Sequence, residues 1–370
     1  MSEDREENSN SALELWKEMA KNPFSRWTEK GDSGNDAGSR IRNGFVIPEV
    51  EPSFAININK PIFTIGSCFA RNIEDVLATE GAQLPAKSIV SPKASSLGVR
   101  PNSVLNKYNI PSILQEIQWS FENTKDFSKE HLLDAGDLHF DPHVHEIVAS
   151  GHESDLIAQH AKVTDVFKQL KNAQTIVMTL GMTEMWYDNL HEIYLNAAPI
   201  LGAIKRNPSR FDFRILSYQK NETFLVDCID CILSTALPGA NIILTVSPVA
   251  LGATFSHRDV IIANSQSKAT LVALAQAVAI DHPQVDYFPS FEAVTWSDPL
   301  FAWENDRRHV SAAMVSCIMS EFLYRYAGKP KPQWPSFKDN RGQQLIVELQ
   351  QQTKSLAKKL SWAQTSIDPR

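Results

Sequence analysis

Short apolar runs alternate with helical patterns along most of the chain. Four runs are typical of buried strands, because they are brief, apolar and mostly rich in β-branched residues: 61–65, 175–180, 241–246 and 285–288. Other stretches repeat apolar residues every three or four positions, as a helix with one buried face does: 69–77, 156–170, 224–233, 259–279 and 310–326. This alternation predicts an α/β fold with a mostly parallel sheet covered on both faces.

The remaining segments fit this pattern less well. Residues 1–45 are polar, with a short amphipathic helix expected at 9–21. Residues 82–150 hold Pro, Ser, Asn and His and one short helix at about 110–121, so we interpret them as an insertion near the functional site. We therefore expect three parts, listed here in order: a polar arm (1–45), an α/β domain (46–328) and a Pro-rich start followed by a helical tail (329–370).

Composition and charge narrow the class of protein. The chain has 370 residues, 43% hydrophobic and 21% charged, which is ordinary for a globular protein. A formal net charge of −7 gives no general attraction to nucleic acid or anionic membranes. The apolar runs are too short to span a bilayer and the N-terminus is acidic, so we expect a cytoplasmic protein without a membrane span.

Four cysteines are too few for a disulfide scaffold in a chain of this length. Cys228 and Cys231 form a CxxC, but they lie in an apolar helical pattern without a second ligand pair, so core packing is favoured over redox or zinc chemistry. His143 and His145 could face one metal. No third ligand is evident, so we expect no metal and favour a lid or substrate contact for these two histidines.

Chemically useful residues follow several of the predicted strands. In doubly wound sheets the carboxyl ends of the strands form the ligand-binding edge, so these loops should converge. They are Gly66-Ser67-Cys68, Gly181-Met182-Thr183-Glu184, Ser247-Pro248 and 305–309. The first of these turns lacks the further glycines of a dinucleotide or phosphate loop.

Cys68 stands between a strand and a helix, where the helix dipole and free N–H groups favour a thiolate and could hold an oxyanion. The competing interpretations are a small residue packed under the turn, or Ser67 as the nucleophile. Asp306 and His309 have the spacing in which a carboxylate can orient an imidazole, as in a catalytic triad. A chance DxxH, with Asp306 acting only as a helix cap, is the alternative.

These residues resemble a known family. Gly66-Ser67-Cys68-Phe69-Ala70 reproduces the signature of the GSCFA domain family, and three further strings resemble it in order: 106–114, 245–249 and 258–268. GSCFA domains look like relatives of the SGNH, or GDSL-type, hydrolases. That resemblance implies a flavodoxin-like three-layer α/β/α sandwich, here with an insertion and helical extensions at the two ends.

The resemblance also implies roles for individual residues. Cys68 falls in the place of the nucleophilic serine, and Asp306 and His309 fall on the Asp-x-x-His block. The Gly-x-Asn-Asp block falls on 181–184, where Thr183 replaces the oxyanion-hole Asn, so Thr183 or backbone N–H groups would have to substitute. Together with the residues chosen above from their positions, the remaining candidates for contact with the oxyanion or substrate are Ser67, Gly98, Gly181, Glu184, His143, His145 and Ser247.

The sequence thus predicts an acyl-transfer enzyme, an esterase or an O-acyltransferase, with Cys68 as nucleophile and the Asp306–His309 pair as base. The expected substrate is a small molecule or a carbohydrate, and no cofactor is required. Acetyl-CoA is a candidate acyl donor, since a similar-looking group of capsule-biosynthesis enzymes is thought to use it. The alternatives are a non-catalytic binding module on the same fold and a thiol or redox role for Cys68. A homo-oligomer formed through the tail is left open.

Overall fold

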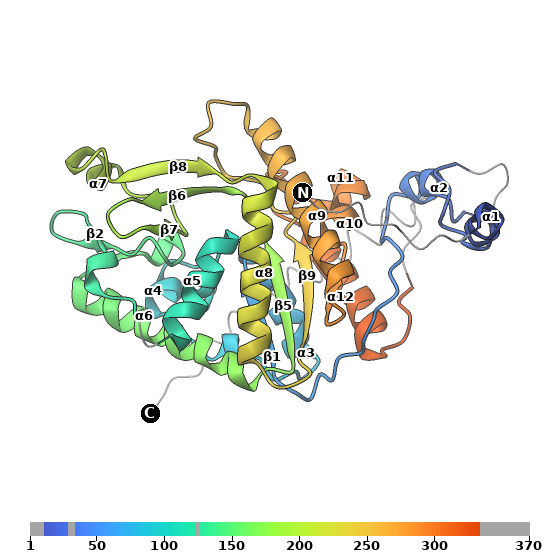
Figure 1. Ribbon diagram of the computed structural model, residues 1–370, viewed down its shortest axis with the longest axis horizontal. Helices are drawn as coiled ribbons and strands as arrows, with labels where there is room; N and C mark the ends of the chain where they lie inside the picture. Colours follow the sequence, from blue (N-terminus) through green and yellow to red (C-terminus); the bar gives the residue numbers. More distant parts are fainter. Residues whose placement is uncertain (1–10, 29–33, 123–125, 334–370) are drawn as a thin grey trace.

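The computed structural model describes residues 11–28, 34–122 and 126–333. All four predicted strands are present and form one parallel sheet in the order β1-β5-β9-β10, of which Figure 1 labels β1, β5 and β9. The strands are β1 (Ile62–Gly66), β5 (Thr175–Leu180), β9 (Asn241–Val246) and β10 (Val285–Tyr287). The predicted α/β architecture with a central parallel sheet is therefore confirmed.

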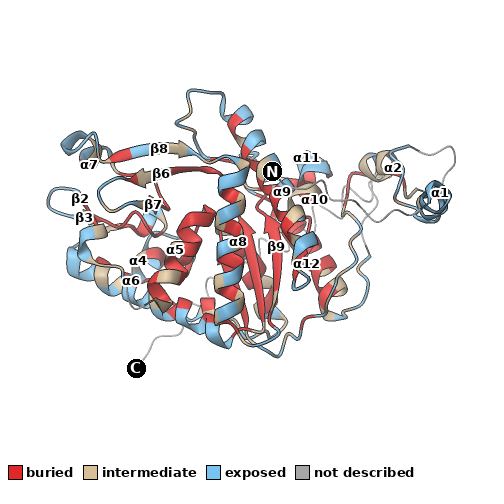
Figure 2. Ribbon diagram, viewed as in Figure 1, coloured by how far each residue is buried: buried red, intermediate tan, exposed pale blue. Residues whose placement is uncertain are grey.

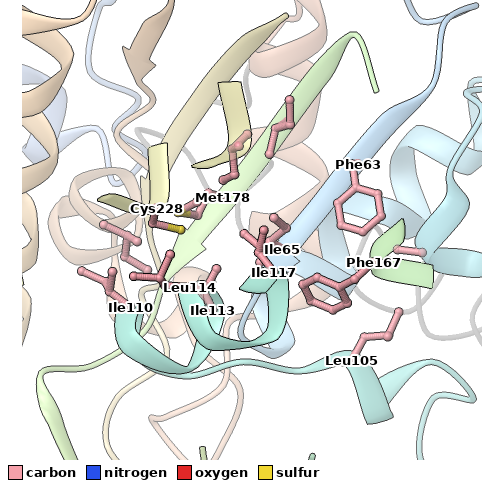
Figure 3. Close-up of a cluster of buried hydrophobic side chains, with 14 of the residues drawn as sticks. Phe63, Ile65, Leu105, Ile110, Ile113, Leu114, Ile117, Phe167, Met178 and Cys228 are labelled. Carbon is pink, nitrogen blue, oxygen red and sulfur yellow. The ribbon is translucent and has the colours of Figure 1, made fainter. Parts of the chain in front are cut away.

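Successive strand residues point to opposite faces of the sheet. Phe63 and Ile65 of β1 enter one core cluster (Figure 3), whereas Ile62 enters a second one. The first cluster is covered by α5 (Ile110–Phe121), α6 (Glu153–Phe167), α8 (Tyr218–Thr235) and α9 (Val260–Asp281). The second is covered by α3 (Cys68–Thr79), α10 (Ser290–Trp296), α11 (Pro299–Ala302) and α12 (Ala312–Ala327). Figure 2 shows the buried sheet between these helices.

The outer edge of β1 departs from the expected sheet. A flavodoxin-like sheet has five strands in the order 2-1-3-4-5. Here β1, β5, β9 and β10 correspond to 1-3-4-5, and beside β1 the described residues supply only a single parallel bridge between Gly66 and Asn106. The segment before Asn106 instead forms short helices, namely η1 (Pro85–Lys87), α4 (Pro92–Ser96) and η2 (Ser103–Leu105).

Two small antiparallel sheets were not predicted. One contains β2 (Leu133–Asp134), β3 (His139–Phe140) and β4 (Ser150–Gly151). The other has the order β7-β6-β8 and consists of β6 (Glu184–Asp188), β7 (Ile193–Leu195) and β8 (Phe211–Ile215). The remaining short helices are η3 (Lys129–His131), η4 (Glu146–Val148), η5 (Lys168–Asn172) and α7 (Leu201–Arg206).

The polar arm carries α1 (Ala12–Lys21) and α2 (Ala37–Arg42), and neither helix has a buried residue. Ser11 and Glu14 form a capping box that starts α1, within the stretch predicted to be helical. Figure 1 shows α1 at the end of the molecule, far from the sheet. Of the predicted tail at 329–370, residues 334–370 lie outside the described residues. Among the helices that are described, none has the length and apolar character needed to cross a membrane.

Candidate functional site

The turn after β1 depends on Gly66. Its φ is +127°, and a Cβ at this position would collide with the Thr179 carbonyl of the neighbouring strand. Ser67 then caps α3, with its Oγ accepting a hydrogen bond from Phe69 N at 3.4 Å, and it is buried. Cys68 is the first residue of the helix and is partly exposed. Between the two competing nucleophiles, the structure therefore commits Ser67 to capping and leaves Cys68 more accessible.

Three basic side chains act electrostatically on the Cys68 thiol. Burial raises the pKa of the thiol, while the positive charges of Arg308, Arg100 and Lys268 act in the opposite direction. The resting side chain is therefore a thiol in an electropositive setting. An acceptor for its proton is needed before it can act as a nucleophile.

Lys268 comes from α9 and is only 1% exposed. Its Nζ donates a hydrogen bond to the carbonyl of Gly181, at the end of β5, over 2.6 Å. Burial lowers the pKa of Lys268 to about 7; Cys68 raises it and Arg308 lowers it further. Because Gly66 pairs with Thr179, residues 68 and 181 follow neighbouring strands, so the ammonium lies beside the Cys68 turn.

Arg308 is partly buried, and its guanidinium contacts the chain after β9. Its Nε donates to the Ala250 carbonyl at 3.1 Å, and a Cβ on Gly252 would lie 3.1 Å from its Nη2. Arg100 is more exposed, and its Nε lies 3.1 Å from Oδ2 of Asp75. Arg308 therefore brings a charge to Cys68 from the loop that contains the predicted acid–base pair.

Asp306 and His309 form the predicted pair. Asp306 Oδ2 lies 2.6 Å from His309 Nδ1, and Asp306 Oδ1 accepts the backbone N–H groups of His309 and Arg308, each at 3.0 Å. These bonds, led by the His309 N–H, hold the pKa of Asp306 well below its usual range. Asp306 thus orients the imidazole. The described residues contain no hydrogen bond between His309 and Cys68, and Arg308, next to His309, is the residue of this loop that acts on the thiol.

Residues 106–108 form another wall of the site. Lys107 N donates to the Gly66 carbonyl at 2.9 Å, and Met182 N donates to the Tyr108 carbonyl at 2.9 Å. This close approach requires Gly181, where a Cβ would lie 2.5 Å from the Tyr108 oxygen. Burial, followed by the charge of Cys68, raises the pKa of Tyr108 far above its usual value. The phenol is therefore neutral and next to the thiol.

The other predicted contacts divide into two groups. Thr183 and Ser247 are buried at the strand ends: Thr183 N donates to Ser267 Oγ at 2.9 Å, and Ser247 N donates to the Leu180 carbonyl at 2.8 Å. The ring of His145 lies 6.2 Å from that of Tyr108. These residues, with Gly181, adjoin the site.

Glu184, Gly98 and His143 are placed differently. The Glu184 carboxylate is occupied by the Thr254 hydroxyl, with a shortest distance of 2.7 Å. Gly98 is exposed at the end of α4 with a φ of +71°. His143 is 1% exposed, which corrects the interpretation of this histidine as part of a polar lid.

His143 belongs to a buried charged network that supports residues 106–108. Lys107 Nζ donates to Glu116 Oε2 and to the His143 carbonyl, both at 2.6 Å. His160 lies 3.3 Å from Glu116 and 2.9 Å from Asp141. Burial opposes protonation of His160, but these two carboxylates outweigh it and raise its pKa to about 9. The network ties α5 and α6 to the loop beside Cys68.

Lys268, Arg308 and Tyr108 were not among the predicted site residues. A lysine within an apolar, Ala-rich helix is the signal that could have identified Lys268, since a buried lysine needs a reason to be there. The predicted core packing of the CxxC is confirmed for Cys228, which is fully buried in the first cluster, with Cys231 packed against it. Within the described ranges, no three His, Cys, Asp or Glu residues are grouped so as to hold a metal ion.

A comparison with curated proteins and with solved structures found no significant match. The family comparison did, over residues 61–322. That range begins just before β1, ends within α12, and so includes Cys68, Lys268 and the Asp306–His309 pair. Since it covers more than half of the chain, the protein belongs to the GSCFA family.

Proposed function

We propose that this protein is an acyl-transfer enzyme of SGNH-like type, with Cys68 as its nucleophile. The observation that supports this most is the convergence of two loops. The helix-capped turn that presents Cys68 lies within reach of the charge of Arg308, and Arg308 neighbours a carboxylate-oriented histidine. A nucleophile, a base and a group that orients the base are the parts that acyl transfer needs.

The proposed reaction has two steps. His309 accepts the thiol proton, and Sγ attacks the carbonyl carbon of an ester or thioester. The bond to the leaving alcohol or thiol then breaks, the proton passes to that leaving group, and a thioester remains on Cys68. In the second step water or a sugar hydroxyl attacks the thioester, loses its proton to His309, and releases the thiol. Acetyl-CoA is a candidate donor.

Charge stabilisation in this scheme does not need an asparagine at position 183. The tetrahedral oxyanion would form at the N-terminus of α3, where free backbone N–H groups and the helix dipole favour negative charge. The charges of Lys268 and Arg308 also favour an anionic group at Cys68. These groups can replace the amide that an SGNH enzyme uses.

Turnover of a panel of 4-nitrophenyl acyl esters and of acetyl-CoA tests the proposal. Cys68→Ala should abolish activity, and His309→Gln should lower kcat by about 10²- to 10⁴-fold, the usual contribution of a general base. Cys231→Ala, at a partly exposed cysteine in α8, serves as the control and should retain activity. Equal turnover by wild type and Cys68→Ala would rule the mechanism out.

A further inference from the structure

Two of the basic side chains that act on Cys68, Lys268 and Arg308, have no carboxylate partner among the described residues. The only hydrogen bond that Lys268 makes within the described part of the chain is to the Gly181 carbonyl, although an ammonium group has three donors. The Arg308 side chain donates from Nε to the Ala250 carbonyl. Neither side chain forms an ion pair among the described residues. This distinguishes both from Arg100, which pairs with Asp75.

An unneutralised cation inside a protein is unfavourable, so buried charges are usually paired or bind a ligand. Lys268 is 1% exposed and Arg308 is partly buried. Cys68 does not neutralise them at rest, because burial raises its pKa and keeps it a thiol. Because burial lowers the pKa of Lys268 to about 7, its amine is only partly protonated near neutral pH and would gain its full charge beside a bound anion, whereas the Arg308 guanidinium supplies a fixed positive charge.

A second observation comes from the neighbouring strand end. Ser247 is 1% exposed, and its hydroxyl has no hydrogen-bond partner in the described structure. Its backbone N–H is bound to the Leu180 carbonyl, which places it directly beside Gly181 and hence beside the Lys268 ammonium. Buried hydroxyl groups normally have partners, so the Ser247 hydroxyl is a further unused donor beside the strand end that Lys268 contacts.

We propose that the Cys68 site binds a substrate that carries an anionic oxygen group, a carboxylate or a phosphate, held by Lys268 and Arg308. That the bound anion is part of the acyl substrate rests on the proposed function. Anion binding at Cys68 can be tested without any turnover. The planar guanidinium of Arg308 suits two-point contact with either group, and Lys268 contributes a compact charge.

Alkylation of Cys68 by two reagents of similar size tests the proposal. Iodoacetate is anionic and iodoacetamide is neutral, and both react with the thiolate, so the ratio of their rates reports anion attraction separately from thiol reactivity. Peptide mapping by mass spectrometry follows each cysteine, with Cys231 as the internal reference. We expect the iodoacetate-to-iodoacetamide ratio at Cys68 to exceed that at Cys231 by about tenfold, since charges at close range in a partly buried site interact strongly.

Matched variants identify the residues responsible. Lys268→Met and Arg308→Gln should each lower the ratio at Cys68 by about threefold or more. Arg307→Gln removes the same charge one position away, from a side chain bonded to the Pro299 carbonyl, and should leave the ratio unchanged. Since Arg308 is only partly buried, its variant keeps the test valid if Lys268→Met does not fold. Equal ratios at Cys68 and Cys231, or no change in Arg308→Gln, would overturn the proposal.

Protection experiments distinguish the two anion classes. Inorganic phosphate and acetate are added separately while iodoacetamide modifies Cys68. Slower modification with phosphate assigns a phosphate-bearing substrate, and slower modification with acetate assigns a carboxylate. Protection by neither anion contradicts the proposal. If the protein binds anions at Cys68 but shows no acyl transfer, the proposed reaction is wrong and the proposed binding site is still supported.

Discussion

Glu116 is the carboxylate on which two buried cations depend. Lys107 Nζ lies 2.6 Å and His160 Nε2 3.3 Å from its oxygens, and all three side chains are at most 1% exposed. Burial alone would raise the pKa of Glu116, but Lys107 and His160 outweigh it and lower the pKa to about 2. Glu116→Gln preserves the shape of the side chain and removes this charge.

The loss can be estimated in two ways. A carboxyl pKa lowered from 4.5 to about 2 corresponds to about 3 kcal/mol of stability, present above pH 4.5 and lost as the pH falls through 2. Removing one partner of a buried ion pair typically costs about 3–5 kcal/mol, because the other charge stays buried. We therefore expect Glu116→Gln to lower the free energy of unfolding by about 3–5 kcal/mol at pH 7.

Urea denaturation of the variant measures this loss. Glu153→Gln is the matched control, since its carboxylate is half exposed and 3.9 Å from His139, and it should change stability by less than about 0.5 kcal/mol. Lys107→Met added to Glu116→Gln removes the stranded ammonium and should recover part of the loss. A Glu116→Gln protein within about 1 kcal/mol of wild type would show that Glu116 does not hold these two buried charges.

Two further predictions follow from the same structure. Because the pKa of His160 is raised from 6.5 to about 9, its contribution to stability is complete below about pH 6.5 and is lost as the pH rises through 9. Over this pH range the urea midpoint of wild type should fall more steeply than that of His160→Gln. Parallel curves for the two proteins would contradict this. Gly66→Ala should prevent folding or cost more than about 3 kcal/mol in thermal or urea unfolding, whereas Gly98→Ala, also at positive φ but with open space around it, should cost only about 1–2 kcal/mol. Similar losses in the two variants would show that the clash with Thr179 is not the cause.

The sheet was predictable because its strands are buried on both faces. A run such as 175–180 is mostly apolar because it is buried on both faces, and the structure reproduces it as β5 (Thr175–Leu180) without a shift. The helix expected at about 110–121 likewise matches α5. The small sheet containing β6 (Glu184–Asp188) was missed since its strands are short and partly exposed, so neither a continuous apolar run nor a clean alternation marks them.

The candidate site was predictable only where it is local in sequence. Cys68 follows from one turn, and the Asp306–His309 contact from a three-residue spacing. Lys268 reaches Gly181 across 87 positions because α9 packs on the sheet, and no local pattern predicts that contact. Similarly, spacing alone could not show that His143 is buried in a charged network while His145 lies near Tyr108.

If the proposed mechanism holds, Cys68 carries the acyl group during turnover. After incubation with 4-nitrophenyl acetate or acetyl-CoA and an acid quench, intact mass and peptide mapping should find one acetyl group on the Cys68 peptide of wild type, removable by hydroxylamine, and none on Cys68→Ala. An unmodified wild-type protein that also shows no turnover, or an acetyl group that persists in Cys68→Ala at the same yield, would contradict the claim.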